Sequence, residues 1–197
     1  MKSTFSRQVG TTVLILLLAL LLLGGAFRVL VGQYLEHNTH DQLQTDALAL
    51  AELVAAYDAA GDLDHENLRT NLTLASLVSG ADTVVLNSQG TVILCSDTDL
   101  QCSHLGLVIN AEFVEQVFRD GSNLDAGTIP QLYEQSRYFV SVPIKSHRTG
   151  ANIGIVTVSM PMDNTQALME GIADIQVTVS LLVILIAVVV MSVSTRN

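Results

Sequence analysis

Two long apolar segments constrain the fold of this chain more than any other feature. In the N-terminal stretch "MKSTFSRQVGTTVLILLLALLLLGGAFRVLVG", the 20 residues between Arg7 and Arg28 carry no charge, and near the C-terminus the 21 residues between Asp174 and Arg196 carry none. At about 1.5 Å of rise per residue, a helix of about 20 residues spans the roughly 30 Å hydrocarbon core of a bilayer. The sequence therefore predicts two transmembrane helices, at residues 9–31 and 175–194, with the lipid bilayer as a partner.

Two alternatives to a transmembrane helix also contain apolar segments of this length. A core helix of a soluble protein is one, but such helices are seldom apolar on every face. A cleaved signal peptide is the other for the first segment, because Lys2 and Arg7 precede the apolar run and "GGA" supplies small residues. Against cleavage, apolar residues resume at Val29 and lead into a further helical pattern. Even a cleaved first segment would leave the middle of the chain outside the cell.

The distribution of charge orients the chain. Lys2 and Arg7 precede the first apolar segment and Arg196 follows the second, whereas all 19 acidic residues lie between Glu36 and Asp174. Only five Lys or Arg residues lie among them, which gives that region a formal charge of −14. By the positive-inside rule, we expect both termini (1–8 and 195–197) in the cytoplasm of a cell with a plasma membrane, and residues 32–174 outside it. Such an acidic domain repels phosphate, so nucleic acid is excluded as a partner.

The central region predicts an α+β domain. Residues 34–60 have apolar side chains at helical spacing and end at Gly61, so we expect one long helix rising from the bilayer. A shorter helix is expected at 64–78, with Asp64 as its cap. Two β-hairpins follow, one around Asn87–Gly90 and one at 137–162, with a short helix at 110–121 between them and an exit helix after Pro161. The expected fold is an antiparallel sheet with a long N-terminal helix, flanked by two transmembrane helices.

The pattern of strands and turns resembles a known family. The stretches "DTVVLNSQGTVILCSD" (82–97), "HLG" (104–106) and "YFVSVPI…GANIGIVTVSMPM" (138–162) are similar to the extracytoplasmic PAS-like (single Cache) sensor region of bacterial transmembrane receptors, chiefly sensor histidine kinases. The resemblance implies a sensor, or input module, that binds a ligand or detects stress and relays the change through its membrane helices. In this family small ligands lie between the concave sheet face and the segments that cross it.

The chain departs from the family at its C-terminus. A histidine kinase continues into a phospho-accepting helix pair and an ATP-binding domain, whereas this sequence stops at Asn197. We therefore expect a fragment of a two-component sensor, a truncated product or a stand-alone membrane-anchored accessory protein. The input region of a chemoreceptor is a further alternative.

Signatures of catalysis are missing from the sequence. It contains no HExxH, G-x-S-x-G, Walker or dinucleotide-binding motif. The stretch "HENLRTNLT" from His65 resembles a kinase phospho-acceptor box, but Asn67 is an extra residue and Asn71 replaces the expected proline. We therefore expect no enzyme activity, no catalytic residue, no cofactor and no metal.

The ligand site is the least defined feature of the sequence. Arg137, Tyr138 and Lys145 lie on or beside a predicted strand and are candidates for binding an anionic ligand. The alternative ligand is a cation or a basic peptide, bound by acidic residues near the membrane. These acidic residues are Asp97, Asp99, Glu112, Glu115 and Asp120.

Cys95 and Cys102 are the two cysteines of the chain. Outside the cytoplasm an even pair of cysteines usually oxidises, so a disulfide between them is favoured. Zinc is a second possibility with His104 as a third ligand, but no fourth ligand stands nearby at the usual spacing. Free thiols are a third.

The long helix also suggests a homodimer. Its apolar stripe, Leu43, Leu50 and Tyr57 flanked by Ala47 and Val54, is wide enough to contact both its own sheet and a partner helix. Receptors of the family that the chain resembles act as dimers.

Overall fold

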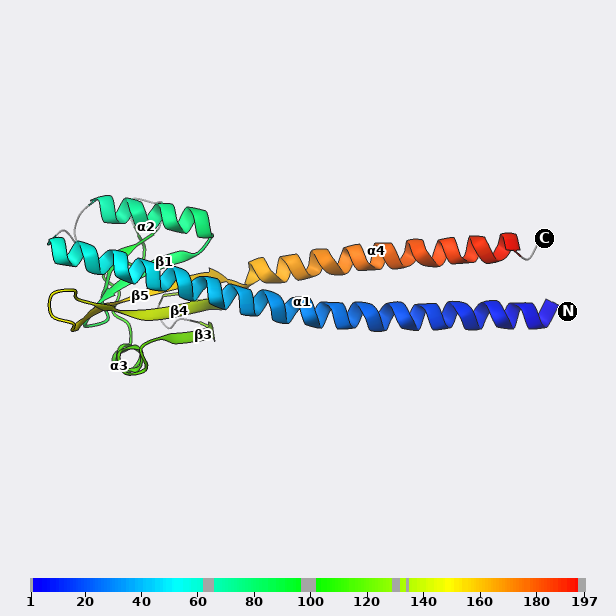
Figure 1. Cartoon of the computed structure of the whole chain (residues 1–197), viewed down its shortest axis with the longest axis horizontal. Coiled ribbons are helices and arrows are strands. Elements are labelled where there is room, and N and C mark those ends of the chain that lie inside the picture. Colours follow the sequence, from blue (N-terminus) through cyan, green and yellow to red (C-terminus); the bar gives the residue numbers. More distant parts are fainter. Residues whose placement is uncertain (1, 62–65, 97–101, 129–131, 134, 195–197) are drawn as a thin grey trace. The chain divides into compact units, whose positions relative to one another are not determined.

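The computed structural model describes residues 2–61, 66–96, 102–128, 132–133 and 135–194. The described part forms four helices and five strands (Figure 1). In chain order they are α1 (Lys2–Ala60), α2 (Glu66–Ser79), β1 (Asp82–Asn87), β2 (Val92–Cys95), α3 (Ala111–Asp120), β3 (Asn123–Gly127), β4 (Arg137–Lys145), β5 (Asn152–Pro161) and α4 (Met162–Ser194).

The chain divides into two compact units. One is His37–Met162, and the other is Met1–Glu36 together with Asp163–Asn197. Within the described residues, the second unit supplies two helices that are long and apolar enough to cross a membrane, one within α1 and one at Gly171–Val189 of α4. Most of their leucine, isoleucine and valine side chains are exposed. A soluble protein rarely exposes so large an apolar surface, whereas lipid would cover it.

The unit His37–Met162 is built on one antiparallel sheet with the strand order β2-β1-β5-β4-β3. The β1–β2 turn forms because Asn87 accepts backbone N–H groups of Gln89 and Thr91 with its side chain, at 3.0 and 2.9 Å. Gly90 completes this turn at a φ of 82°, a value that glycine adopts without strain. The hairpins expected around Asn87–Gly90 and at 137–162 are thus both present.

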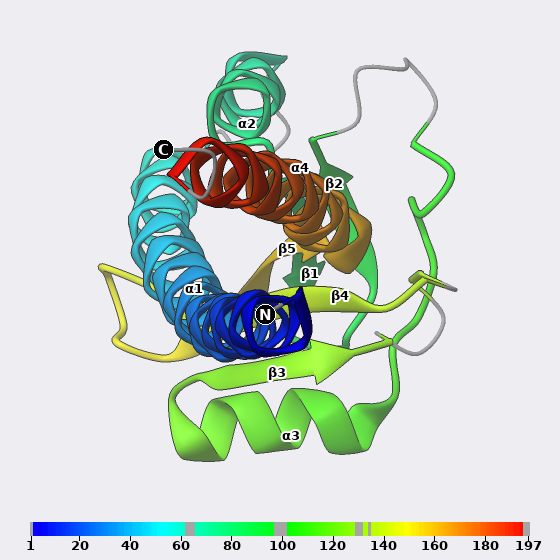
Figure 2. The ribbon, with the colours of Figure 1, turned by 90° about the vertical axis from the view of Figure 1, so that its right-hand side faces the viewer.

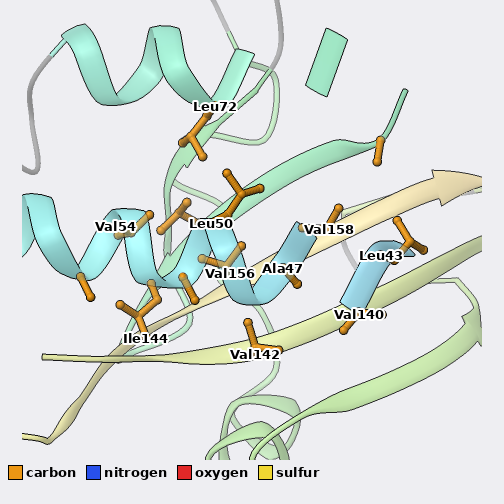
Figure 3. Packing of buried hydrophobic residues seen from close by; sticks show 14 of the residues in the cluster. Leu43, Ala47, Leu50, Val54, Leu72, Val140, Val142, Ile144, Val156 and Val158 are labelled. Atoms are coloured by element: carbon orange, nitrogen blue, oxygen red, sulfur yellow. The ribbon is translucent and has the colours of Figure 1, made fainter. Parts of the chain in front are cut away.

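The first core lies between the sheet and the helices α1 and α2. Leu43, Ala47, Leu50 and Val54 of α1 point onto valines of β4 and β5, and Leu72 of α2 joins them (Figure 3). All five side chains are buried within this one chain. The apolar stripe of α1 is therefore occupied by the core, and a dimer contact would need another face of the helix.

The second core lies on the opposite sheet face, which α3 covers (Figure 2). Val114 and Val117 of α3 are buried there against Phe139 and Ile155. The Asn110 side chain accepts the N–H of Glu112 and so caps the start of α3, while Gly121 ends the helix with a left-handed φ of 77°. The expected short helix is confirmed.

Two details differ from the expectations. β3 was not predicted, because "NLDAG" has neither β-branched residues nor alternation, and it is a strand only through pairing with β4. The second helix is present as α2, but its expected cap, Asp64, lies outside the described residues.

Asp46 is a polar residue in the packed part of α1. Its Oδ2 is shielded from solvent and has no hydrogen-bond partner among the described residues. Burial raises the pKa of the Asp46 carboxyl above its ordinary value of 3.8. The native state therefore holds this proton to a higher pH than the unfolded chain does, and stability falls as pH rises through the native pKa.

We expect Asp46→Asn to raise the melting temperature at pH 7, because the amide removes a charge that burial disfavours. The advantage should shrink as the pH falls, because the raised pKa lets the carboxyl of the native state take up its proton before that of the unfolded chain. Thermal unfolding of both proteins between pH 7 and 4 measures this. Glu115→Gln, at an exposed position of α3, is the matched control and should show no such trend. A variant that is less stable than the wild type at pH 7 would contradict the assignment.

Candidate functional site

A row of buried polar side chains crosses the sheet face that α3 covers. Because side chains alternate along a strand, Arg137 and Ser141 of β4 share this face with Phe139, and Thr157 and Ser159 of β5 lie beside them in register. All four polar residues are at most 5% exposed. Buried polar groups in native proteins are almost always hydrogen-bonded, so their partners define the site.

Arg137 is the centre of this cluster. Its Nε donates to Oγ of Ser159 at 3.1 Å, and its Nη2 donates to the carbonyl oxygen of Ser159 at 3.4 Å and forms an ion pair with the carboxylate of Asp82. The sheet makes this possible, because Asp82 of β1 lies opposite Ser159 of β5. Beside them, the hydroxyls of Ser141 and Thr157 lie 2.8 Å apart and share a hydrogen bond.

The electrostatics of the site follow from the guanidinium. A guanidinium is a cation, so its burial needs a counter-ion and hydrogen bonds. Asp82 is the counter-ion, and 39% of its side chain is exposed, so it has room to turn towards solvent. Within the described residues no acceptor bonds to Nη1 of Arg137. A guanidinium donates to a carboxylate through two parallel N–H groups, and Asp82 is the carboxylate that Arg137 meets here.

The aromatic ring of Tyr133 lies over the cluster, and a second ring lies against Tyr133. The ring centre of Tyr133 is 4.1 Å from Cζ of Arg137, a cation–π distance. The ring of His104 lies against Tyr133, with 4.9 Å between the ring centres. Tyr133 precedes β4, and His104 follows the second cysteine, so two different segments converge here.

The structure separates the three residues that the sequence proposes for an anionic ligand. Arg137 is in the buried cluster. Tyr138, the next residue of β4, points to the opposite face, where its ring contacts His40 of α1 with 5.3 Å between ring centres. Lys145 is exposed at the far end of the same strand. Asp82, Ser159, Tyr133 and His104 were missed, because no local signal indicates which strands and segments meet Arg137.

The structure describes three of the five acidic residues proposed for a cationic ligand, and both cysteines. Glu112, Glu115 and Asp120 are exposed on α3, and Asp97 and Asp99 lie outside the described residues. Cys95, at the end of β2, forms a disulfide with Cys102, and their Cα atoms lie 6.4 Å apart. Among the described residues, no three His, Cys, Asp or Glu side chains are arranged to bind a metal ion.

Comparison with known proteins identifies the fold. No family model matches the sequence, and no curated protein matches it. Among solved structures, the extracellular ligand binding receptor of Desulfohalobium retbaense aligns with a TM-score of 0.58 at 16% identity, over 76% of this chain and 26% of that one. The ligand-binding domain of the Campylobacter jejuni chemoreceptor Tlp3, in complex with 4-methylisoleucine, gives 0.52 at 16% identity, over 85% and 62%.

The sensor domain of Escherichia coli DcuS aligns with a TM-score of 0.50 at 14% identity. This alignment spans 67% of our chain and 98% of the DcuS domain, whereas the chain spans less than two thirds of the other two proteins. At these identities the comparison establishes a shared fold. The expected long helix and antiparallel sheet are therefore confirmed, and the chain shares the fold of these sensor and ligand-binding domains.

Proposed function

We propose that this chain is the extracytoplasmic input module of a bacterial membrane receptor and that it binds a small carboxylate at Arg137. The observation that carries the proposal is the position of Arg137. It lies opposite Pro161 in the sheet, and Pro161 is the last residue of β5 before α4 begins at Met162. Ser159, two residues before the end of β5, makes two of the contacts of the guanidinium.

This position links the site to the apolar helix. A ligand that draws Arg137 away from Asp82 or Ser159 changes the contacts of the strand end that continues into α4. Met162 is also tied to the segment before Arg137, since its N–H donates to the carbonyl oxygen of Ser136 at 3.2 Å. A change in binding at Arg137 is thereby coupled to the start of the helix, which is what an input module requires.

The chemistry of the ligand follows from the guanidinium fork, which matches a carboxylate. The Tlp3 domain, which shares the fold, was solved with 4-methylisoleucine, an amino acid. A cationic ligand on the exposed acids of α3 is the alternative. We infer that the output is that of a histidine kinase, with a chemoreceptor or a stand-alone accessory role as alternatives, and that the receptor acts as a homodimer in the plasma membrane.

A ligand screen on the full chain in detergent tests the binding. Amino acids and small carboxylates such as isoleucine and succinate form one arm, and magnesium and spermidine form the other. We expect at least one carboxylate to raise the melting temperature in a saturable manner. Stabilisation by cations alone would favour the acidic surface instead.

The membrane topology is a separate prediction. Both termini should be cytoplasmic and the sensor unit outside, since the basic residues flank an acidic centre. With the native cysteines joined, a single introduced cysteine reports its own side of the membrane. In intact cells an impermeant maleimide should label Ser122→Cys, whereas Thr4→Cys should react only after permeabilisation. Labelling of Thr4→Cys in intact cells would refute this topology.

A further inference from the structure

A continuous row of contacts runs from the disulfide to the buried guanidinium. Sγ of Cys102 lies 4.0 Å from Nδ1 of His104, whose ring lies against Tyr133. Tyr133 in turn lies over the guanidinium of Arg137. The Cys95–Cys102 bond is thus connected to Arg137 through two rings.

Tyr133 covers a face of the Arg137 guanidinium. The two residues beside Arg137 in the sheet are Gly127 of β3 and Pro161 of β5. Gly127 has no side chain to cover the guanidinium. Asp82 and Ser159 accept from its N–H groups, which lie in the guanidinium plane, so these two residues contact the edge of the group and not its face. The ring of Tyr133 fills this face.

His104 is held from both sides along the chain. Two residues before it, the disulfide ties Cys102 to the end of β2. After it, Gly106 donates its N–H to the carbonyl oxygen of Val92 at 3.0 Å, and the N–H of Val92 donates to Leu107 at 2.9 Å. Opening the disulfide would remove the first of these anchors and leave the second.

We propose that His104 and the Cys95–Cys102 disulfide are positioning elements of the Arg137 site. They hold Tyr133 over the guanidinium. In this position the ring sets how easily a carboxylate ligand, or a dicarbonyl reagent that modifies arginine, reaches Arg137. The identity of the biological ligand rests on the proposed function. Access of a reagent to Arg137, however, can be measured without knowing that ligand.

Chemical modification of the full chain in detergent tests the proposal. Phenylglyoxal reacts with exposed guanidinium groups, and mass spectrometry gives the rate at each arginine. Arg119, exposed on α3, is the internal reference. We expect Arg137 to react slowly in the wild type, and about tenfold faster relative to Arg119 in both His104→Ala and the double variant Cys95→Ser/Cys102→Ser.

His104→Phe keeps a ring against Tyr133 and should keep Arg137 protected, a rescue that a purely structural defect would not show. If the cysteine variant folds poorly, the test is carried by the two His104 variants. Their melting temperatures should equal that of the wild type, which shows that they are folded. The proposal is overturned if Arg137 reacts within twofold of the wild-type rate in His104→Ala, or if His104→Phe reacts as fast as His104→Ala.

The two proposals fail separately. If no carboxylate binds the wild type but the reactivity of Arg137 follows this pattern, the ligand assignment is wrong and the positioning role stands. If a carboxylate binds through Arg137 but the reactivity of Arg137 is the same in the His104 variants as in the wild type, the positioning role is wrong and the function stands.

Discussion

Arg137→Ala is expected to weaken carboxylate binding about 100-fold, because truncating one partner of a buried, hydrogen-bonded charge pair typically costs about 2–5 kcal/mol. The variant removes the buried cation of the proposed binding site and the donors to Ser159. Titration of the full chain with the carboxylate found in the screen, followed by calorimetry or thermal shift, measures the loss. Arg137→Lys retains the charge without the planar fork and should recover only part of the affinity.

The same substitution should destabilise the fold only moderately. Asp82 loses its counter-ion, but its carboxylate is partly exposed and can turn to water, so the penalty is far below that of a fully buried lone charge. We expect the free energy of unfolding to fall by about 1–3 kcal/mol, mainly because Ser159 loses its hydrogen-bond donor and Tyr133 loses a packing partner. Arg119→Ala is the matched control, since it removes an equal charge from an exposed helix face. Binding by Arg137→Ala within twofold of the wild type would place the ligand elsewhere.

The elements with local signals were predictable from sequence. The turn at Asn87–Gly90 and the end of α3 at Gly121 each depend on one or two residues whose chemistry is visible without a fold. The long helix follows from the uninterrupted spacing of Leu43, Leu50 and Tyr57. β3 lacked any such signal, because its strand conformation is imposed by the pairing partner.

Of the residues in the candidate site, only the central one, Arg137, was predictable from the sequence. β4 is buried on both faces, so its apolar run does not tell which of Arg137 and Tyr138 shares a face with α3. Arg137 meets Asp82, 55 positions earlier, only because β1 and β4 both pair with β5. Such a contact depends on the register of three strands, and register is not encoded in any single stretch of the chain.

That register depends in turn on Gly154, and Gly154→Ala should cause the largest loss of stability among the single changes considered. Gly154 lies in β5 between Asn87 of β1 and Ile144 of β4. A Cβ atom there would overlap the carbonyl oxygen of Leu86 and lie 3.2 Å from Cδ1 of Ile144. A backbone oxygen cannot rotate away as a side chain can, so β1 and β5 must separate locally.

We expect Gly154→Ala to cost about 3 kcal/mol, at the upper end for an overpacked core, and to lower the melting temperature by about 10 °C. Gly127→Ala is the matched control: it also places a methyl group in a strand, but among the described residues no atom beyond its chain neighbours lies within 4 Å of the added Cβ. Circular-dichroism melts of the full chain in detergent compare the two. If Gly154→Ala melts within 2 °C of Gly127→Ala, β1 and β5 do not approach as closely as described. The register that brings Asp82 and Ser159 to Arg137 would then need another explanation, because that close approach fixes β1 against the centre of the sheet.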